Sequence, residues 1–206
     1  GEAIEKLELD GGKIKDAAAL DALVGGAFAK LVSTTTTEGL KTQTPPKNGG
    51  GKQIGVATSD SPAGPFTDLG RPVVTASPVG GGQQIDVDVF TDPVSGKSYL
   101  YWGNGYMAGA ELNDDMVSIK ENTVTVMTPA GGTLQDYAFR EAAYVFYRNG
   151  LYYFMWSVDD TGSPNYHVAY GTSKSPLGPI EVAKQPVVLI QNPEKEIYGP
   201  AHNAVL

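Results

Sequence analysis

Glu141 is the side chain in this sequence best placed to act as an acid. It heads a mostly apolar run that ends at Arg148, and a second aromatic run covers residues 151–157 after the dipeptide Asn149-Gly150. Asn-Gly between two such runs predicts a β-hairpin, because both turn residues tolerate positive φ. A carboxyl group at the head of a buried strand has its charged form disfavoured by desolvation, which suits a general acid. The alternative is an ordinary strand-end residue that pairs with Arg140 or Arg148.

The composition limits the class of protein and the class of partner. A chain of 206 residues with 26 glycines, 14 prolines and 18% charged residues is typical of one turn-rich, mostly β domain and not of a disordered segment. The formal net charge of −8 argues against nucleic acid and anionic membrane surfaces as partners. A neutral ligand, or a cation held by carboxylates, fits better.

Several other features are excluded by what the sequence does not contain. The chain has no cysteine, which excludes disulfides and thiolate chemistry. No apolar run is long enough to predict a transmembrane helix, and no signal peptide is recognised.

Two repeats with consistent spacing run through the chain. Residues 57–65 read Ala-Thr-Ser-Asp-Ser-Pro-Ala-Gly-Pro and return at 171–179 as Gly-Thr-Ser-Lys-Ser-Pro-Leu-Gly-Pro. At half that spacing, Val89-Phe90 with residues 96–103 matches Val145-Phe146 with residues 150–157, and residues 26–33 are a weaker echo. A unit of about 55 residues built from short strands and tight turns is typical of a β-propeller blade. The alternative, that aromatic strands simply resemble one another, does not explain the consistent spacing.

The repeats also align two carboxylates. Counting back from the aligned Phe90 and Phe146, Asp86 lies four residues before the first and Glu141 five before the second. The inner strand of each propeller blade begins near the central channel, so we expect both carboxylates to meet there. Acid/base chemistry on a sugar requires such a pair.

Four stretches resemble the motifs of family 43 glycoside hydrolases, in the order and at the spacing of their blades. The resemblance covers residues 54–206 and rests on residues 54–66, 85–103, 140–157 and 197–205. The family comprises five-bladed propellers that include β-xylosidases, α-L-arabinofuranosidases and arabinanases. The resemblance therefore implies hydrolysis of a glycosidic bond with inversion of configuration.

The resemblance also implies roles for individual residues. Glu141 matches the general acid, Asp86 matches the aspartate that tunes and orients this acid, and His202 matches a channel histidine that helps to hold a calcium ion. Two positions depart from the family pattern, because Ala142 replaces a glycine after the acid and Ala-His-Asn-Ala at 201–204 replaces Gly-His-Asn-Ser. No organic cofactor is implied.

The catalytic base is not assigned. In the family it is a separate aspartate of the first blade, far upstream of the position that Asp86 matches, and this blade is expected to be absent here. Asp10, Asp16 and Asp21 are the only early aspartates, and none lies in a recognisable Asp-Pro motif.

Other polar candidates receive structural interpretations. Asp88 is an alternative to Asp86, since strand alternation places both on one face, but the motif favours Asp86. His167 lies inside a predicted strand and is interpreted as structural. The acid pairs Asp114-Asp115 and Asp159-Asp160 lack the alternating oxygen ligands of a calcium loop and are interpreted as solvated turns.

Trp102 and Trp156 are candidate platforms for stacking a sugar. Because both lie within predicted blade strands, packing between blades is the preferred interpretation.

The sequence thus predicts an all-β protein of the five-bladed β-propeller type, incomplete, with about three and a half blades. One domain spans residues 1–206, with a degenerate N-terminal blade and loop over 1–53 and recognisable blades over 54–206. The expected function is inverting hydrolysis of xylose- or arabinose-containing plant polysaccharides or oligosaccharides. The alternative is a non-catalytic carbohydrate-binding or truncated propeller that lacks the base.

Partners and location are expected from the same resemblance. The partner is an oligo- or polysaccharide, and another chain or segment would complete the propeller. The resemblance points to a secreted or extracellular protein, with the cytoplasm as the alternative.

Overall fold

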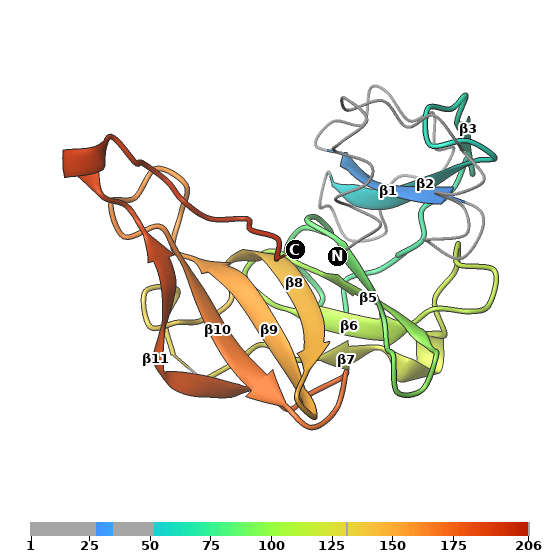
Figure 1. The fold of residues 1–206 in the computed structure, drawn as a ribbon. Coiled ribbons are helices and arrows are strands. Elements are labelled where there is room, and N and C mark those ends of the chain that lie inside the picture. The colour runs from blue at the N-terminus through green and yellow to red at the C-terminus, as the bar shows by residue number, and fades with distance from the viewer. Residues whose placement is uncertain (1–27, 35–51, 131, 206) are drawn as a thin grey trace, which may run out of the picture.

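In the part of the chain that the structure describes, three antiparallel sheets follow one another (Figure 1). The computed structural model describes residues 28–34, 52–130 and 132–205. The early aspartates at 10, 16 and 21 and most of the expected N-terminal loop lie outside these residues. The first sheet contains β1 (Phe28–Thr34), β2 (Gln53–Ser59) and β3 (Thr67–Asp68).

The other two sheets have four strands each, and all three sheets are meanders in which strands adjacent in sequence pair. The second contains β4 (Asp88–Thr91), β5 (Ser98–Trp102), β6 (Ala108–Glu111) and β7 (Thr125–Val126). The third contains β8 (Glu141–Arg148), β9 (Leu151–Val158), β10 (His167–Ser173) and β11 (Glu181–Ile190). The described residues include only two short 3₁₀ helices, η1 (Glu121–Thr123) and η2 (Pro193–Lys195). None of the helices in this part of the chain is long and apolar enough to span a membrane.

The predicted hairpin is present. β8 and β9 pair directly, and Asn149 and Gly150 between them have φ of 51° and 81°. Such a turn requires positive φ at both central residues, which is why Asn-Gly favours it.

The longer repeat of the sequence is also a repeat of structure. After β2, Ser61 N–H donates to Ser59 Oγ over 3.1 Å, and the Gly64–Pro65 peptide is cis. After β10, Ser175 N–H donates to Ser173 Oγ over 3.1 Å, and the Gly178–Pro179 peptide is cis. β2 and β10 are therefore equivalent strands, and β1 corresponds to β9, as the weaker echo predicted.

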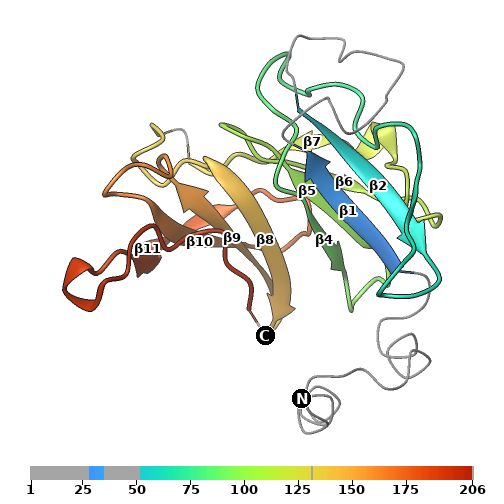
Figure 2. The same cartoon turned by 90° about the horizontal axis from the view of Figure 1, so that it is seen from above.

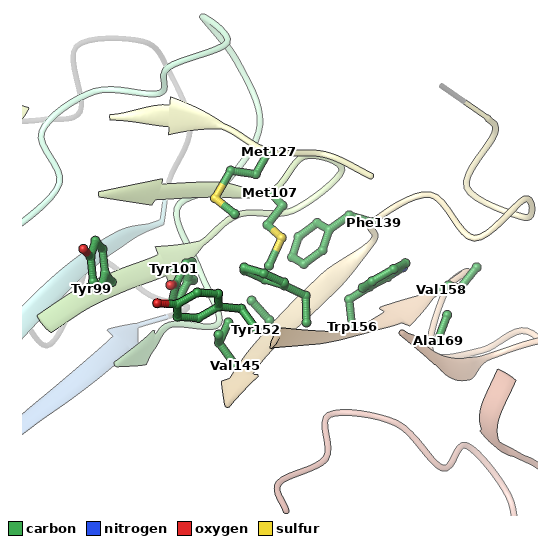
Figure 3. Close-up of a cluster of buried hydrophobic side chains, with 12 residues drawn as sticks. Tyr99, Tyr101, Met107, Met127, Phe139, Val145, Tyr152, Trp156, Val158 and Ala169 are labelled. Carbon is green, nitrogen blue, oxygen red and sulfur yellow. The ribbon is translucent and has the colours of Figure 1, made fainter. Parts of the chain in front are cut away.

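Two hydrophobic cores join the sheets face to face. Ile54 and Val56 of β2 pack with Leu100 and Trp102 of β5 between the first and second sheets. Between the second and third sheets lies a larger core (Figure 3), built from Tyr99, Tyr101, Met107, Met127, Phe139, Ala143, Val145, Tyr152, Phe154, Trp156, Val158 and Ala169.

The packing interpretation of the two tryptophans is confirmed. Trp102 and Trp156 are fully buried, one in each core. Their indole N–H groups are satisfied, because Trp102 donates to Gln84 Oε1 over 3.1 Å and Trp156 donates to the Tyr137 carbonyl over 2.8 Å. Neither ring is available to stack on a sugar.

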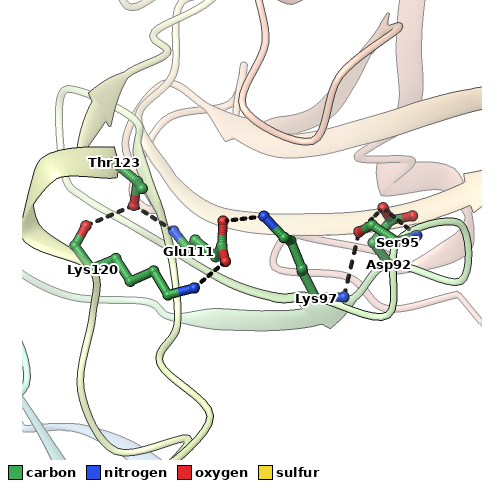
Figure 4. Close-up of polar contacts among 6 residues, drawn as sticks. All are labelled: Asp92, Ser95, Lys97, Glu111, Lys120 and Thr123. Carbon is green, nitrogen blue, oxygen red and sulfur yellow. Dashed lines mark hydrogen bonds and ion pairs between the residues drawn. The ribbon is translucent and has the colours of Figure 1, made fainter.

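An ion network fixes the outer part of the second sheet (Figure 4). Glu111 at the end of β6 accepts hydrogen bonds from Lys120 and from Lys97, the latter over 3.0 Å. Both contacts lower the pKa of Glu111, and the hydrogen bond from Lys120 has the larger effect. The network ties η1 and the β4–β5 turn to β6.

The turn after β5 depends on a glycine. Gly103 has φ of 136°, and a Cβ built on it would lie 1.9 Å from the carbonyl oxygen of Tyr106. We expect Gly103→Ala to lower the free energy of unfolding by more than about 3 kcal/mol, because backbone would have to move. The measurement is urea unfolding.

Gly96→Ala is the matched control. Gly96 also has positive φ, at 72°, but no heavy atom lies within 4 Å of the added Cβ. This variant is expected to lose only about 1–2 kcal/mol. Equal losses in the two variants would show that the close approach to Tyr106 does not constrain the turn.

Candidate active site

Glu141 lies at the first position of β8, and its carboxylate contacts two other segments. Oε2 accepts a hydrogen bond from Asn104 Nδ2 over 2.9 Å, and Oε1 accepts one from the Tyr166 hydroxyl over 3.1 Å. The alternative of an ion pair with Arg140 or Arg148 is wrong, because Arg140 pairs with Asp160 over 2.9 Å and Arg148 lies at the opposite end of β8, beside Leu151. Glu141 thus has neutral hydrogen-bond donors as partners instead of a cation.

A β-bulge directly follows Glu141 and sets the direction of its side chain. Glu141 pairs with Ser157 and Tyr144 pairs with Met155, so β8 contains one more residue than β9 over this interval. Ala142 within the bulge has φ of 60°. A bulge of this kind favours glycine in the left-handed position, which accounts for the glycine of the family motif.

The bulge also explains an irregular count in the sequence. Asp86 precedes Phe90 by four residues, whereas Glu141 precedes Phe146 by five. The extra residue of the bulge supplies this difference.

Asp86 lies two residues before β4, near Glu141. Burial raises the pKa of the Asp86 carboxyl; the His202 charge opposes this, and the Glu141 charge adds to it. Asp86 has φ of 55° and precedes the strand, so strand alternation is not what aims it, contrary to the sequence argument.

Asp88 has a different partner. Its Oδ2 accepts the backbone N–H of Val145 over 2.8 Å, which joins β4 to β8. Burial raises the pKa of Asp88 to about 6, although this hydrogen bond opposes the shift. The carboxylate is therefore bound to the backbone of the neighbouring sheet.

His202 completes the group. The chain leaves η2, returns to the inner strand β8 (Figure 1), and ends beside it, where the Tyr144 hydroxyl donates to the Val205 carbonyl over 2.8 Å. His202 N–H donates to the buried Ser157 Oγ over 3.1 Å, and His202 Nδ1 lies 3.9 Å from Asp86 Oδ2. The structure thus brings all three predicted site residues together where the second and third sheets meet. Figure 2 shows these two sheets from above.

The charges around this group are mostly negative. Glu141, Asp86 and Asp88 are acidic, and His202 and Lys52 are the basic groups that act on Asp86. Within the described ranges, no three His, Asp or Glu side chains gather closely enough to hold a metal ion.

The remaining polar candidates have structural environments. His167 is buried in β10 and packs edge-on against Tyr137. Asp115 accepts hydrogen bonds from Ser118, and Asp159 accepts one from Ser163, so both acid pairs lie in hydrogen-bonded turns.

Sequence reasoning missed Asn104 and Tyr166. Asn104 lies in the β5–β6 connection of the second sheet, and Tyr166 precedes β10 in the third. The available signal was the dipeptide Gly103-Asn104 after an aromatic strand, but nothing local connects it to Glu141.

The sequence of this chain matches the model of a known protein family. The model of Glycosyl hydrolases family 43 matches residues 30–206. The chain belongs to glycosyl hydrolase family 43. The predicted all-β, propeller-type fold is that of the family, and the chain contains part of it.

Known relatives agree with this membership. A β-D-galactofuranosidase, xynD, of Aspergillus niger is 35% identical over 161 residues, which cover 76% of this chain and 44% of the relative. A thermostable family-43 glycoside hydrolase of known structure has the same fold, with a TM-score of 0.68, 24% identity and coverage of 86% of this chain and 56% of that one.

A third comparison is with a family-43 β-xylosidase/α-arabinofuranosidase from a compost microbial metagenome, solved with xylotriose in a calcium-free form. It is 26% identical, has a TM-score of 0.60, and is matched over 79% of this chain and 53% of its own. The chain spans about half the length of the proteins it matches.

Asp88 should make the protein less stable as pH rises, the opposite of the usual effect of a carboxylate in a folded protein. Its pKa in the folded protein is about 6, against 3.8 ordinarily, so the folded state binds the proton more tightly. Stability is then lost as pH rises from about 4 to about 6. We expect Asp88→Asn to gain about 1–3 kcal/mol relative to wild type between pH 4 and pH 7.5, measured by urea unfolding.

Asp115→Asn is the control with the opposite sign. Hydrogen bonds from Ser118 lower the pKa of Asp115, so its contribution is present above the ordinary carboxyl range and lost as pH falls. This variant should lose stability relative to wild type as pH rises. The interpretation of Asp88 is wrong if both variants respond to pH in the same direction.

Proposed function

We propose that this chain is the acid-bearing part of a glycoside hydrolase that cleaves xylose- or arabinose-containing plant polysaccharides or oligosaccharides with inversion. The observation that carries the proposal is the meeting of Glu141, Asp86 and His202 where two sheets adjoin, in a chain of family 43. Glu141 protonates the glycosidic oxygen. Asp86 orients this acid and acts on it through its negative charge.

The reaction needs one group more. A separate base activates water on the opposite side of the sugar, and inverting enzymes place acid and base roughly 6.5–9.5 Å apart. We assign no base, because the early aspartates lie outside the described residues. A further segment or chain that completes the propeller belongs to the same proposal.

Furanosides should be included among the substrates tested. The Aspergillus niger relative is named for β-D-galactofuranoside hydrolysis, and the metagenomic relative for β-xyloside and α-arabinofuranoside hydrolysis. The alternative function, carbohydrate binding without catalysis, predicts that none of the three is hydrolysed.

Calcium binding at His202 also stays a proposal, supported by a relative described as a calcium-free form. Calcium takes six to eight oxygen ligands. The described residues gather no such cluster, so His202 would supply only part of the site. A calcium-dependent rise in Tm that is lost in His202→Ala would support the site, and an equal rise in that variant would contradict it.

A secreted or extracellular location is proposed from the family resemblance alone. Fractionation of the source cells would test it.

Glu141→Gln tests the acid. We expect kcat on unactivated aryl β-xylosides, α-L-arabinofuranosides or β-D-galactofuranosides to fall about 10²–10⁴-fold, because the amide cannot transfer a proton. Glu121→Gln, at an exposed glutamate of η1, should keep wild-type activity. A folded wild type without activity on all three substrates would favour the binding-only alternative.

Asp86→Asn tests the partner. We expect kcat/KM on aryl glycosides to fall about 10–100-fold, because the neutral amide removes the charge that the proposal assigns to orienting Glu141. Hydrolysis rates of the variant and the wild type measure this. Unchanged rates would show that Asp86 does not act through its charge.

A further inference from the structure

The two carboxylate oxygens of Glu141 have partners of different chemistry. Asn104 Nδ2 lies 2.9 Å from Oε2, and the Tyr166 hydroxyl lies 3.1 Å from Oε1. An amide nitrogen can only donate a hydrogen bond, whereas a phenolic hydroxyl can donate or accept. A proton on Oε2 would weaken that oxygen as the acceptor of the Asn104 hydrogen bond, whereas a proton on Oε1 finds in Tyr166 a partner that can accept it.

We propose that Asn104 is a positioning residue that keeps Oε2 as a hydrogen-bond acceptor, so that the transferable proton of Glu141 lies on Oε1, beside Tyr166. This inference rests on the proposed function and adds to it the atom that delivers the proton. It also assigns a role to a residue outside the family motifs on which the sequence resemblance rests.

The fold holds Asn104 firmly in place. Gly103 before it approaches the Tyr106 carbonyl too closely for any side chain, and Gly105 after it donates its N–H to the Arg140 carbonyl over 2.7 Å. The turn is thus bonded to the residue that precedes Glu141. The segments that carry the amide and the carboxylate are therefore joined by a backbone hydrogen bond next to both residues.

Tyr166 is held equally well. Its side chain is buried, and its N–H donates to the Ser163 carbonyl over 3.1 Å. The hydroxyl can rotate to accept the proton of Oε1 in the acid form and to donate to Oε1 in the carboxylate form. Glu141 therefore keeps both partners through the reaction.

The step balances without a further reagent. The Oε1–H bond breaks and the proton joins the glycosidic oxygen, which takes the electron pair of the breaking carbon–oxygen bond. Water adds to the sugar carbon and gives its own proton to the base. Glu141 is left as a carboxylate that accepts hydrogen bonds from Asn104 and Tyr166.

Leaving-group dependence tests the role of Asn104. A substrate with a good leaving group, such as a 2,4-dinitrophenyl glycoside, needs little protonation, whereas a phenyl glycoside needs much. We expect Asn104→Leu to lower kcat about 10–100-fold on the phenyl glycoside and less than about threefold on the dinitrophenyl glycoside. Equal losses on both would overturn the proposal, because a general structural defect affects both alike.

Asn113→Leu is the matched control. The Asn113 amide donates to Ser118 Oγ and to the Ile119 carbonyl in the same sheet, without contact to Glu141. Its loss should change both rates by the same factor. A selective loss on the phenyl glycoside in this variant would also count against the role of Asn104.

A neutron structure of the wild-type protein at acidic pH tests the proton position without any turnover. Deuterium on Oε1, with the Asn104 amide directed at Oε2, is the expected result. Deuterium on Oε2 would overturn the inference. A wild type that hydrolyses no glycoside would refute the proposed function, while the neutron structure would still decide the position of the proton.

Discussion

The contact between β4 and β8 is the constraint on which the candidate site depends. These strands belong to different sheets, and the hydrogen bond from Val145 N–H to Asp88 ties their backbones together. The core around Trp156 and Tyr101 holds the same two sheets face to face. Because a close-packed core resists small displacements, the starts of both strands are fixed relative to each other. Glu141 and Asp86 meet for this reason.

Backbone conformation does the finer positioning. Asp86, Ala142 and His202 all have φ between 53° and 60°. In a residue other than glycine, this conformation costs roughly 1–2 kcal/mol. The conformation therefore persists only where the surrounding structure enforces it. Here it recurs where the chain passes the meeting point of the sheets.

Local and periodic signals were sufficient to predict most of the architecture. The turn at Asn149-Gly150 is determined by its own residues, and the repeated Thr-Ser-x-Ser-Pro turns recur with the same hydrogen bonds. Burial of Trp102 and Trp156 followed from their place in strands. In each case the determining residues lie close together in sequence.

The contacts of the site could not be predicted in this way. Asn104 reaches Glu141 from another sheet, so no local pattern records the contact. The alternative interpretation, a pair between Glu141 and Arg140, is wrong because Arg140 pairs with Asp160. The β-bulge after Glu141 is visible in the sequence only as one extra residue between Glu141 and Phe146, compared with Asp86 and Phe90. Strand alternation does not apply to Asp86, because β4 begins after it.

The division of labour between Asp86 and Asp88 follows from their partners. Both carboxyls are buried enough that the charged form is disfavoured. Asp88 accepts the Val145 N–H over 2.8 Å and so joins β4 to β8. Asp86 is linked to β8 as well, through a backbone hydrogen bond at Ala142, and the His202 charge acts on both carboxyls. The Glu141 charge, however, shifts the pKa of Asp86 and not that of Asp88, so Asp86 is the carboxyl that lies close enough to act on the acid.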